Sequence, residues 1–149
     1  MYQVMVVDDE EYILKALKRT INTYTDWEVE TYQDPHEALR RARTTVFDAV
    51  ITDYMMPEMN GLELLQELRD LQPDTIRIVL TGVIDIETVM SAINKAGAFR
   101  FIPKPWDDDQ LLDNIREGLK FRYILLENRI LAETVREQRE TLRSMGYEG

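Results

Sequence analysis

Five polar side chains that could perform chemistry together stand at similar places in the chain. Each one follows a short run of apolar and β-branched residues that is typical of a strand. These residues are Asp8, Asp9, Asp53, Thr81 and Lys104. If the strands lie parallel in one sheet, three carboxylates, a hydroxyl and an ammonium group converge on one crevice at the carboxyl ends of the strands. Carboxylates so close together repel one another, so either some are protonated or a cation lies among them.

The cation that best suits such a crevice is Mg²⁺. It is a small, hard ion that prefers oxygen ligands, takes few of them from the protein and keeps waters that a phosphate can replace. Beside it, an aspartate can attack a phosphoryl group and become an acyl phosphate. A lysine and a hydroxyl then neutralise the phosphoryl oxygens. The five side chains together therefore predict phosphoryl transfer to a carboxylate.

Each of these residues also has an ordinary structural explanation. Asp8 and Asp9 could cap a helix, and Asp53 could belong to a turn. Thr81 could simply end a strand, and Lys104 could be a solvated surface residue. It is their joint placement at the ends of four strands that favours the chemical interpretation.

The elements that must position these residues alternate along the first 120 positions. Strand patterns cover 3–7, 28–32, 47–52, 75–80 and 98–102. Helical patterns cover 11–24, 35–43, 61–70 and 85–96, and a last helix begins near Asp107. This alternation predicts an α/β fold: a flavodoxin-like (βα)5 doubly wound parallel sheet with helices on both faces. The second strand has the alternating character of an edge strand, which favours the strand order 2-1-3-4-5.

Composition excludes several classes of function. The chain has no cysteine and one histidine, so disulfides, thiolate metal sites and histidine metal clusters are excluded. The net charge of −10 arises within residues 1–120, because 121–149 carry equal numbers of acidic and basic side chains. Such a surface repels nucleic acid and anionic membranes, so we expect no direct contact with either. No apolar run approaches a membrane span of roughly 20 residues, and the amino terminus does not resemble a signal peptide, so the expected location is cytoplasmic.

Four stretches resemble the signature blocks of response regulator receiver domains from two-component signalling systems. They are VMVVDDE, DAVITDYMMPEMNGLELL, RIVLTG and AGAFRFIPKPW, and they occur in the family's order across residues 1–120. The resemblance implies that Asp53 is the phosphoacceptor and that Asp8, Asp9 and Asp53 itself hold Mg²⁺. It also implies that the backbone carbonyl of Met55 supplies a further metal ligand.

The same resemblance implies roles for residues on the last two strands. Lys104 matches the lysine that contacts the phosphoryl group, and its bond to Pro105 is expected to be cis. Thr81 matches the switch hydroxyl. Phe101 matches the aromatic residue that turns inward when Thr81 moves, although an ordinary core phenylalanine would fit the same position.

The last predicted helix is longer than the sheet can cover. Residues 121–149 therefore form a helical extension of the receiver domain at 1–120, either a coiled coil or a linker to an output domain. With position a at Phe121, Asn128, Val135 and Leu142, position d falls on Ile124, Leu131, Gln138 and Met145. One asparagine at a favours a parallel pair. A lone amphipathic helix that folds back on the domain, or a linker helix, remains an alternative.

The predicted function is signalling through phosphorylation. The expected partner is a sensor histidine kinase or a phosphotransfer protein, and we expect no enzymatic activity beyond the chain's own phosphorylation and dephosphorylation. A homodimer through the carboxyl-terminal helix and the face of the fourth and fifth helices is also expected.

Three alternatives remain. A receiver-like dimerisation scaffold would work without phosphorylation. A haloacid-dehalogenase-type phosphatase needs a second acid where Met55 stands, and a flavodoxin-like cofactor binder needs a phosphate loop where the sequence has VVDDEE.

Overall fold

Strands and helices alternate along the chain as the sequence pattern predicts, in a computed structural model that describes residues 1–82 and 85–146. The strands are β1 (Gln3–Val7), β2 (Glu28–Tyr32), β3 (Ala49–Asp53), β4 (Ile76–Thr81) and β5 (Arg100–Pro103). The helices are α1 (Glu11–Tyr24), α2 (Pro35–Ala42), α3 (Gly61–Leu71), α4 (Ile86–Lys95) and α5 (Asp108–Ser144).

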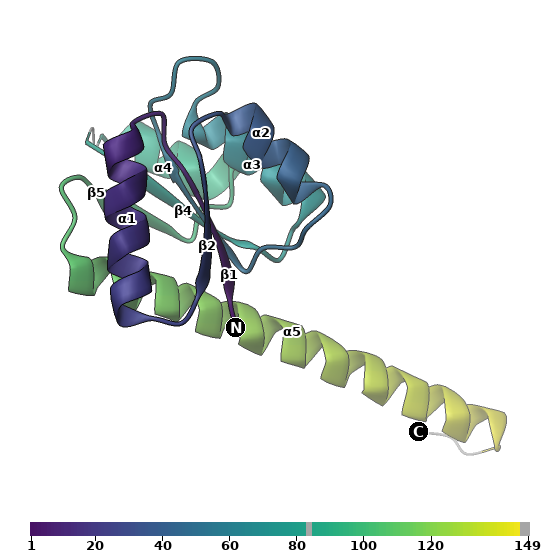
Figure 1. Cartoon of the computed structure of the whole chain (residues 1–149). Helices are drawn as coiled ribbons and strands as arrows, with labels where there is room; N and C mark the ends of the chain where they lie inside the picture. The colour runs from purple at the N-terminus through teal and green to yellow at the C-terminus, as the bar shows by residue number, and fades with distance from the viewer. Residues whose placement is uncertain (83–84, 147–149) are drawn as a thin grey trace.

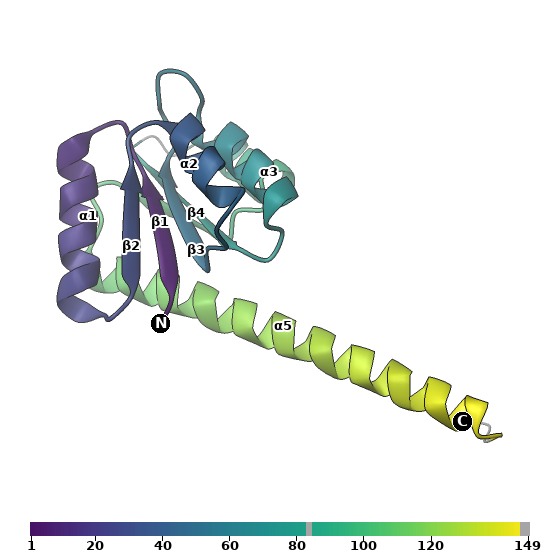
Figure 2. The same ribbon diagram turned by 45° about the vertical axis from the view of Figure 1, so that its right-hand side comes forward.

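The strands form one parallel sheet in the order β2-β1-β3-β4-β5, so the predicted flavodoxin-like topology is confirmed. The order reverses beside β1, whose neighbours are β2 on one side and β3 on the other. Helices α1 and α5 lie on one side of the sheet, and α2 and α3 lie on the other (Figures 1 and 2). A doubly wound sheet of this kind places its ligand crevice at the carboxyl ends of the strands, where the order reverses.

The sheet separates two apolar cores. Val4 and Val6 of β1 face the core that α1 and α5 cover, while Met5 and Val7 face the core under α2 and α3. This division follows from the strand's pleat, which points successive side chains to opposite faces. Because both faces of the inner strands are covered, every residue of β3 and β4 is buried.

Three strands have boundaries that differ from the prediction. Strand β3 begins at Ala49 instead of Phe47, because side chains satisfy the Phe47 backbone: its N–H donates to Gln72 Oε1 (2.9 Å) and its carbonyl accepts from Thr75 Oγ1 (2.7 Å). Strands β3 and β4 each run one residue further than predicted, so Asp53 and Thr81 are the last residues of their strands. Strand β5 is shifted to Arg100–Pro103.

Side-chain caps mark the starts of α2, α3 and α5. Asp34 accepts a hydrogen bond from the His36 N–H, with Pro35 in the first turn, as predicted for α2. Asn60 accepts from the Glu63 N–H at the start of α3, and Asp107 accepts from the Gln110 N–H at the start of α5. The helix predicted at 85–96 spans Ile86–Lys95 and is followed by Gly97 in the left-handed conformation (φ 63°).

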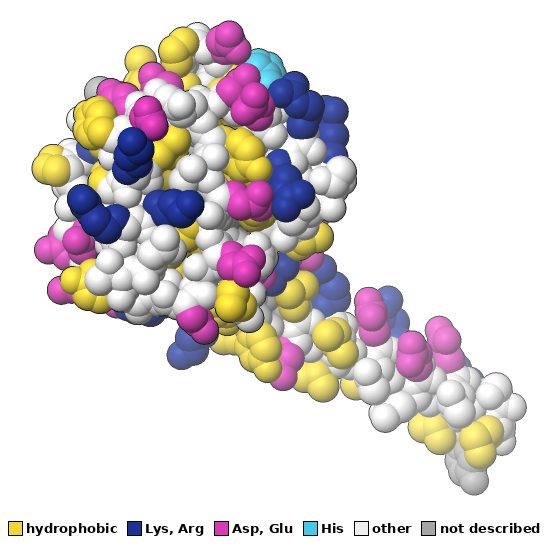
Figure 3. All heavy atoms as spheres, in the orientation of Figure 1, with side chains coloured by type: hydrophobic (Ala, Val, Ile, Leu, Met, Phe, Trp, Pro, Cys, Tyr) yellow, Lys and Arg dark blue, Asp and Glu magenta, His cyan; other side chains and the backbone are white. Residues whose placement is uncertain are grey.

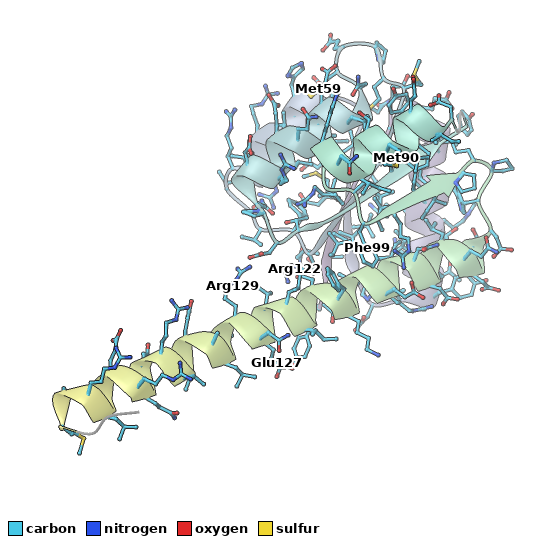
Figure 4. The ribbon with its side chains drawn as sticks, turned by 180° about the vertical axis from the view of Figure 1, so that it is seen from behind. Met59, Met90, Phe99, Arg122, Glu127 and Arg129 are labelled. Atoms are coloured by element: carbon cyan, nitrogen blue, oxygen red, sulfur yellow. The ribbon has the colours of Figure 1, made fainter. Side chains whose placement is uncertain are left out.

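Helix α5 is one continuous helix of 37 residues that leaves the body of the domain (Figures 1 and 2). Its buried part ends at Leu119. The next ten residues, nearly three turns, are still attached: Phe121 stacks on Phe99 (ring centroids 5.5 Å apart), Arg122 pairs with Asp48 (2.9 Å) and Arg129 pairs with Asp74. Figure 4 shows Phe99, Arg122 and Arg129 on the side of α5 that faces the domain, with Glu127 on the far side.

Gly118 permits the close approach of α5 to the sheet, since a Cβ there would lie 2.6 Å from Ile76 Cγ2.

Among the described residues, no helix is both long and apolar enough to cross a bilayer.

Candidate functional site

An acidic pocket lies at the carboxyl ends of β1 and β3. Asp8 follows β1 and Asp53 ends β3, and these two strands are hydrogen-bonded neighbours. Carboxylate oxygens of Asp8, Asp9 and Asp53 lie within 4.8 Å of one another. Asp8 is 1% exposed and Asp53 is 8% exposed, whereas Asp9 is the more open to solvent. The predicted convergence of three carboxylates is therefore present in the structure.

Lys104 enters the same pocket from the end of β5. Its Nζ lies 3.0 Å from Asp8 Oδ2 and 3.1 Å from Asp53 Oδ1, so one ammonium group bridges carboxylates from two strands. The Lys104 N–H donates to the Thr81 carbonyl (2.7 Å), and the Lys104–Pro105 bond is cis, as the resemblance implies. The ends of β4 and β5 are thus joined beside the pocket.

Burial governs the electrostatics of the pocket. Desolvation raises the pKa of Asp8 above its ordinary value, although the Glu10 N–H and Lys104 oppose the shift. Desolvation also raises the pKa of Asp53, and the charge of Asp9 adds to that rise. Burial alone would lower the pKa of Lys104, but its hydrogen bonds to Asp8 and Asp53 outweigh burial and raise it. One lysine therefore does not fully compensate the three carboxylates.

An Mg²⁺ ion fits this donor set. All the side-chain ligands are carboxylate oxygens, which hard divalent cations prefer, and a bound cation would offset the cost of burying the Asp8 and Asp53 charges, which raises the pKa of both carboxyls. Receiver domains in general bind Mg²⁺ through an acidic pocket of this kind.

Backbone contacts fix the acidic side chains from behind. The Glu10 N–H donates to Asp8 Oδ1 (2.8 Å), which orients that carboxylate. The Tyr54 N–H donates to the Leu80 carbonyl (3.0 Å), and the Gly61 N–H donates to the Tyr54 carbonyl (2.8 Å). Gly61 lies so close that a Cβ there would overlap the Asp53 carbonyl. Only glycine lets the β3–α3 connection, residues 54–60, fold back against the end of β3.

The other predicted residues lie on the elements around the pocket. Thr81 is 1% exposed and ends β4. Phe101 of β5 is half-buried and packs against the core under α2 and α3, a position that suits both a switch residue and an ordinary core residue. Met55 stands in the β3–α3 connection with its side chain exposed. The functional roles of all three remain predictions.

Sequence reasoning missed two features near the pocket. A groove of about 560 Å³ beside Lys104 is lined by Glu10, Tyr12, Ile13, Pro105 and Trp106. On the other side of the pocket, Asp34, His36 and Glu58 gather their side chains. The lone histidine gave no signal in the sequence, because Glu58, the acid that its imidazole approaches, comes from another loop.

Comparisons with known proteins agree with this geometry. The family model for the response regulator receiver domain matches residues 4–116. The hydrogenase transcriptional regulatory protein HoxA of Cupriavidus necator is 34% identical over 78% of this chain and 24% of its own length. The C4-dicarboxylate transport transcriptional regulatory protein DctD of Pseudomonas aeruginosa is 32% identical over 93% of this chain and 29% of its own length.

The chain therefore spans less than a third of these two relatives. A solved CheY-like response regulator receiver domain protein of Methanospirillum hungatei superposes with a TM-score of 0.78 at 30% identity, over 83% of this chain and 97% of that one. The fold, the acidic pocket and these matches lead to one conclusion: the chain belongs to the response regulator receiver domain family of two-component signalling.

Proposed function

We propose that this chain is a phosphorylation-driven switch in a two-component phosphorelay, with Asp53 as the phosphoacceptor. Receiver domains accept phosphoryl groups from histidine kinases, so the proposed donor is a phosphohistidine of a sensor kinase or phosphotransfer protein. The observation that carries the assignment is the contact of Lys104 Nζ with both Asp53 (3.1 Å) and Asp8 (3.0 Å). That contact supports Asp53 as an acceptor carboxylate beside a metal-binding carboxylate, Asp8, because the Lys104 ammonium group reaches both.

In the proposed reaction an Asp53 carboxylate oxygen attacks the phosphorus. The new oxygen–phosphorus bond forms as the bond from phosphorus to the donor's imidazole nitrogen breaks, and the electron pair returns to that nitrogen. Asp8, Asp9, Asp53 and the carbonyl of Met55 would hold Mg²⁺, which supplies positive charge for the phosphoryl oxygens when it is bound. Lys104 supplies a second positive charge from its present position near Asp53.

The proposed switch uses the junction between β4 and β5. A phosphoryl group on Asp53 adds negative charge beside Lys104 and draws the Thr81 hydroxyl toward it. Because the Lys104 N–H is bonded to the Thr81 carbonyl, movement of one strand end is coupled to the other. Half-buried Phe101 then occupies the space that Thr81 leaves, and the surface of α4, β5 and α5 changes shape.

Helix α5 is the proposed output element. A stripe of exposed apolar side chains runs along it, away from the side that carries Arg122 and Arg129: Ile124, Leu131, Val135 and Leu142. Figure 3 shows apolar side chains on the part of α5 beyond the body of the domain. We propose that two copies pair through this stripe, with Asn128 in the seam. Phe121, the first residue of the predicted seam, already stacks on Phe99 of its own chain, so pairing would begin at Ile124.

Intact mass analysis tests the central assignment. The purified chain is incubated with Mg²⁺ and a small phosphodonor such as acetyl phosphate, and it is expected to gain one phosphoryl group. Asp53→Asn should abolish the gain, while the matched change of an exposed α3 carboxylate, Asp70→Asn, should leave it unchanged. No gain by the wild-type chain would favour the phosphorylation-independent scaffold. An equal gain by Asp53→Asn would place the acceptor elsewhere.

Turnover of the small phosphodonor separates the proposed switch from a phosphatase of the haloacid dehalogenase type. Such an enzyme uses an acid two residues after its nucleophile, where this chain has the exposed, apolar Met55. We therefore expect one phosphorylation per chain and slow release of phosphate. Multiple rapid turnovers would instead support the hydrolase.

A further inference from the structure

A second cluster of metal-binding side chains lies beside the acidic pocket but shares no residue with it. Donor atoms of Asp34, His36 and Glu58 lie within 4.8 Å of one another, and His36 Nε2 lies 3.7 Å from Glu58 Oε2. Asp34 and His36 come from the start of α2, whereas Glu58 comes from the β3–α3 connection. Figure 3 shows the chain's one imidazole, in cyan, at the surface beside acidic side chains.

We propose that Asp34, His36 and Glu58 form a binding site for a divalent transition metal, with Zn²⁺ as its representative. The site offers one imidazole nitrogen and two carboxylate oxygens, a set that suits zinc, nickel or copper. Mg²⁺ favours oxygen ligands, so it belongs in the pocket of Asp8, Asp9 and Asp53. The donor atoms therefore favour a transition metal at Asp34, His36 and Glu58 and Mg²⁺ in the neighbouring acidic pocket.

Local structure holds part of this site in place. Asp34 Oδ1 accepts the His36 N–H (2.8 Å), so the N-cap fixes that carboxylate over the first turn of α2 while its other oxygen can coordinate. Donor atoms around a tetrahedral zinc ion lie roughly 3.3 Å apart, for bonds of about 2.0 Å. The site therefore needs a closure of about an ångström or more. His36 and Glu58 can provide it, because their side chains are 49% and 71% exposed.

Charge also favours a cation here. The amino terminus of α2 carries partial positive charge, which by itself disfavours a metal ion. Asp34 and Glu58 contribute two full negative charges at the site and outweigh it. Water would complete the coordination, because three protein ligands leave a position open.

A bound ion would connect two loops at the rim of the acidic pocket. A cavity of about 350 Å³ is lined by Asp9 of that pocket together with Gln33, Asp34, Pro35, Pro57 and Glu58. Glu58 stands in the same connection as Met55, whose carbonyl is the proposed magnesium ligand. Metal at the second site would therefore hold the loop that carries Met55 against the start of α2.

The test uses the full chain without any affinity tag, titrated with Zn²⁺ in saturating Mg²⁺. Because the chain has one histidine and no cysteine, the ¹⁵N imidazole resonances report a single site. We expect one equivalent of Zn²⁺ to shift these resonances, with a matching one-site isotherm by calorimetry. His36→Gln should weaken binding by at least about tenfold, since loss of a ligand costs more than loss of the groups that support one.

Two further ligand variants and two controls define the site. Asp34→Asn keeps a competent N-cap, so it and Glu58→Gln should weaken binding without unfolding α2. The exposed α3 variant Glu67→Gln should bind as the wild type does, and so should Asp53→Asn, which separates this site from the phosphoacceptor pocket. Imidazole resonances that do not move with Zn²⁺, or equal affinity in His36→Gln, would overturn the proposal.

Discussion

Lys104 Nζ lies 3.1 Å from Asp53 Oδ1 while it also contacts Asp8, so the ammonium group that follows β5 pairs with one carboxylate that ends β3 and another that follows β1. This arrangement offsets part of the repulsion among the three carboxylates of the pocket. It also means that Lys104 and a metal ion act on the same carboxylates.

Replacement of Lys104 by methionine should therefore separate metal binding from phosphorylation. Without the ammonium group, Mg²⁺ affinity should rise by roughly tenfold, since repulsion between a unit charge and a divalent ion about 4 Å away exceeds 1 kcal/mol even in solvated surroundings. Phosphorylation by a small phosphodonor should slow by roughly a hundredfold, because one charge that stabilises the transferring group is lost. Calorimetry and timed mass spectrometry measure the two effects.

An exposed lysine of α1, Lys18, supplies the control for this experiment. Lys18→Met removes the same charge from the chain but not from the pocket, and it should leave both quantities unchanged. Weaker Mg²⁺ binding in Lys104→Met would contradict the competition between lysine and metal.

The raised pKa values of Asp8 and Asp53 predict how stability depends on pH in the absence of divalent cations. Because burial raises both values above 3.8, the folded state holds protons that the unfolded state has lost. The free energy of unfolding should therefore fall as pH rises from about 3.8 through the raised values.

Urea denaturation of Asp53→Asn against the wild type measures this contribution. The variant should be the more stable protein at pH 7 in the presence of a chelator, and its advantage should shrink as the pH is lowered toward 4. Saturating Mg²⁺ should reverse the order at pH 7, because the ion binds the folded wild-type pocket and stabilises it. A wild-type protein that is more stable than the variant at pH 7 without metal would contradict the desolvation argument.

Much of this site could be predicted from the sequence because parallel strands place their carboxyl ends at one edge of the sheet. Asp8, Asp53 and Lys104 therefore had to converge once the strand order was known. The ends of β3, β4 and β5 differ from their predicted positions by one or two residues. Phe47, for example, has the character of a strand residue, but the side chains of Gln72 and Thr75 satisfy its backbone.

Contacts that depend on the angle between elements could not be predicted in this way. The pairs Asp48–Arg122 and Asp74–Arg129 join residues 74 and 55 positions apart, and they exist only because α5 crosses the amino-terminal edge of the sheet at a particular angle. The cluster of Asp34, His36 and Glu58 likewise depends on how two loops fold toward each other. Side-chain periodicity carries no information about either geometry.

Gly61 should be intolerant of even the smallest side chain. A Cβ at this position overlaps the carbonyl of Asp53, so Gly61→Ala should lower the free energy of unfolding by about 1–3 kcal/mol. It should also slow phosphorylation, since the β3–α3 connection must shift away from the acceptor. Gly82→Ala is the matched control, because a Cβ at Gly82 meets no atom within 4 Å. Equal stability of the two variants in urea would refute the close approach as the reason for glycine at position 61.

Pairing of two α5 helices should be sensitive to charge placed in the proposed seam. If Leu131 and Val135 lie in the seam of a dimer, the double change Leu131→Glu and Val135→Glu places four carboxylates in it, and the chain should sediment as a monomer. The control is Ile130→Glu with Ser144→Glu, which adds the same charge at exposed α5 positions of heptad type c, away from the proposed seam. That variant should remain dimeric. Monomeric behaviour of the wild-type chain, both before and after phosphorylation, would instead show that α5 acts as a linker whose apolar stripe does not pair.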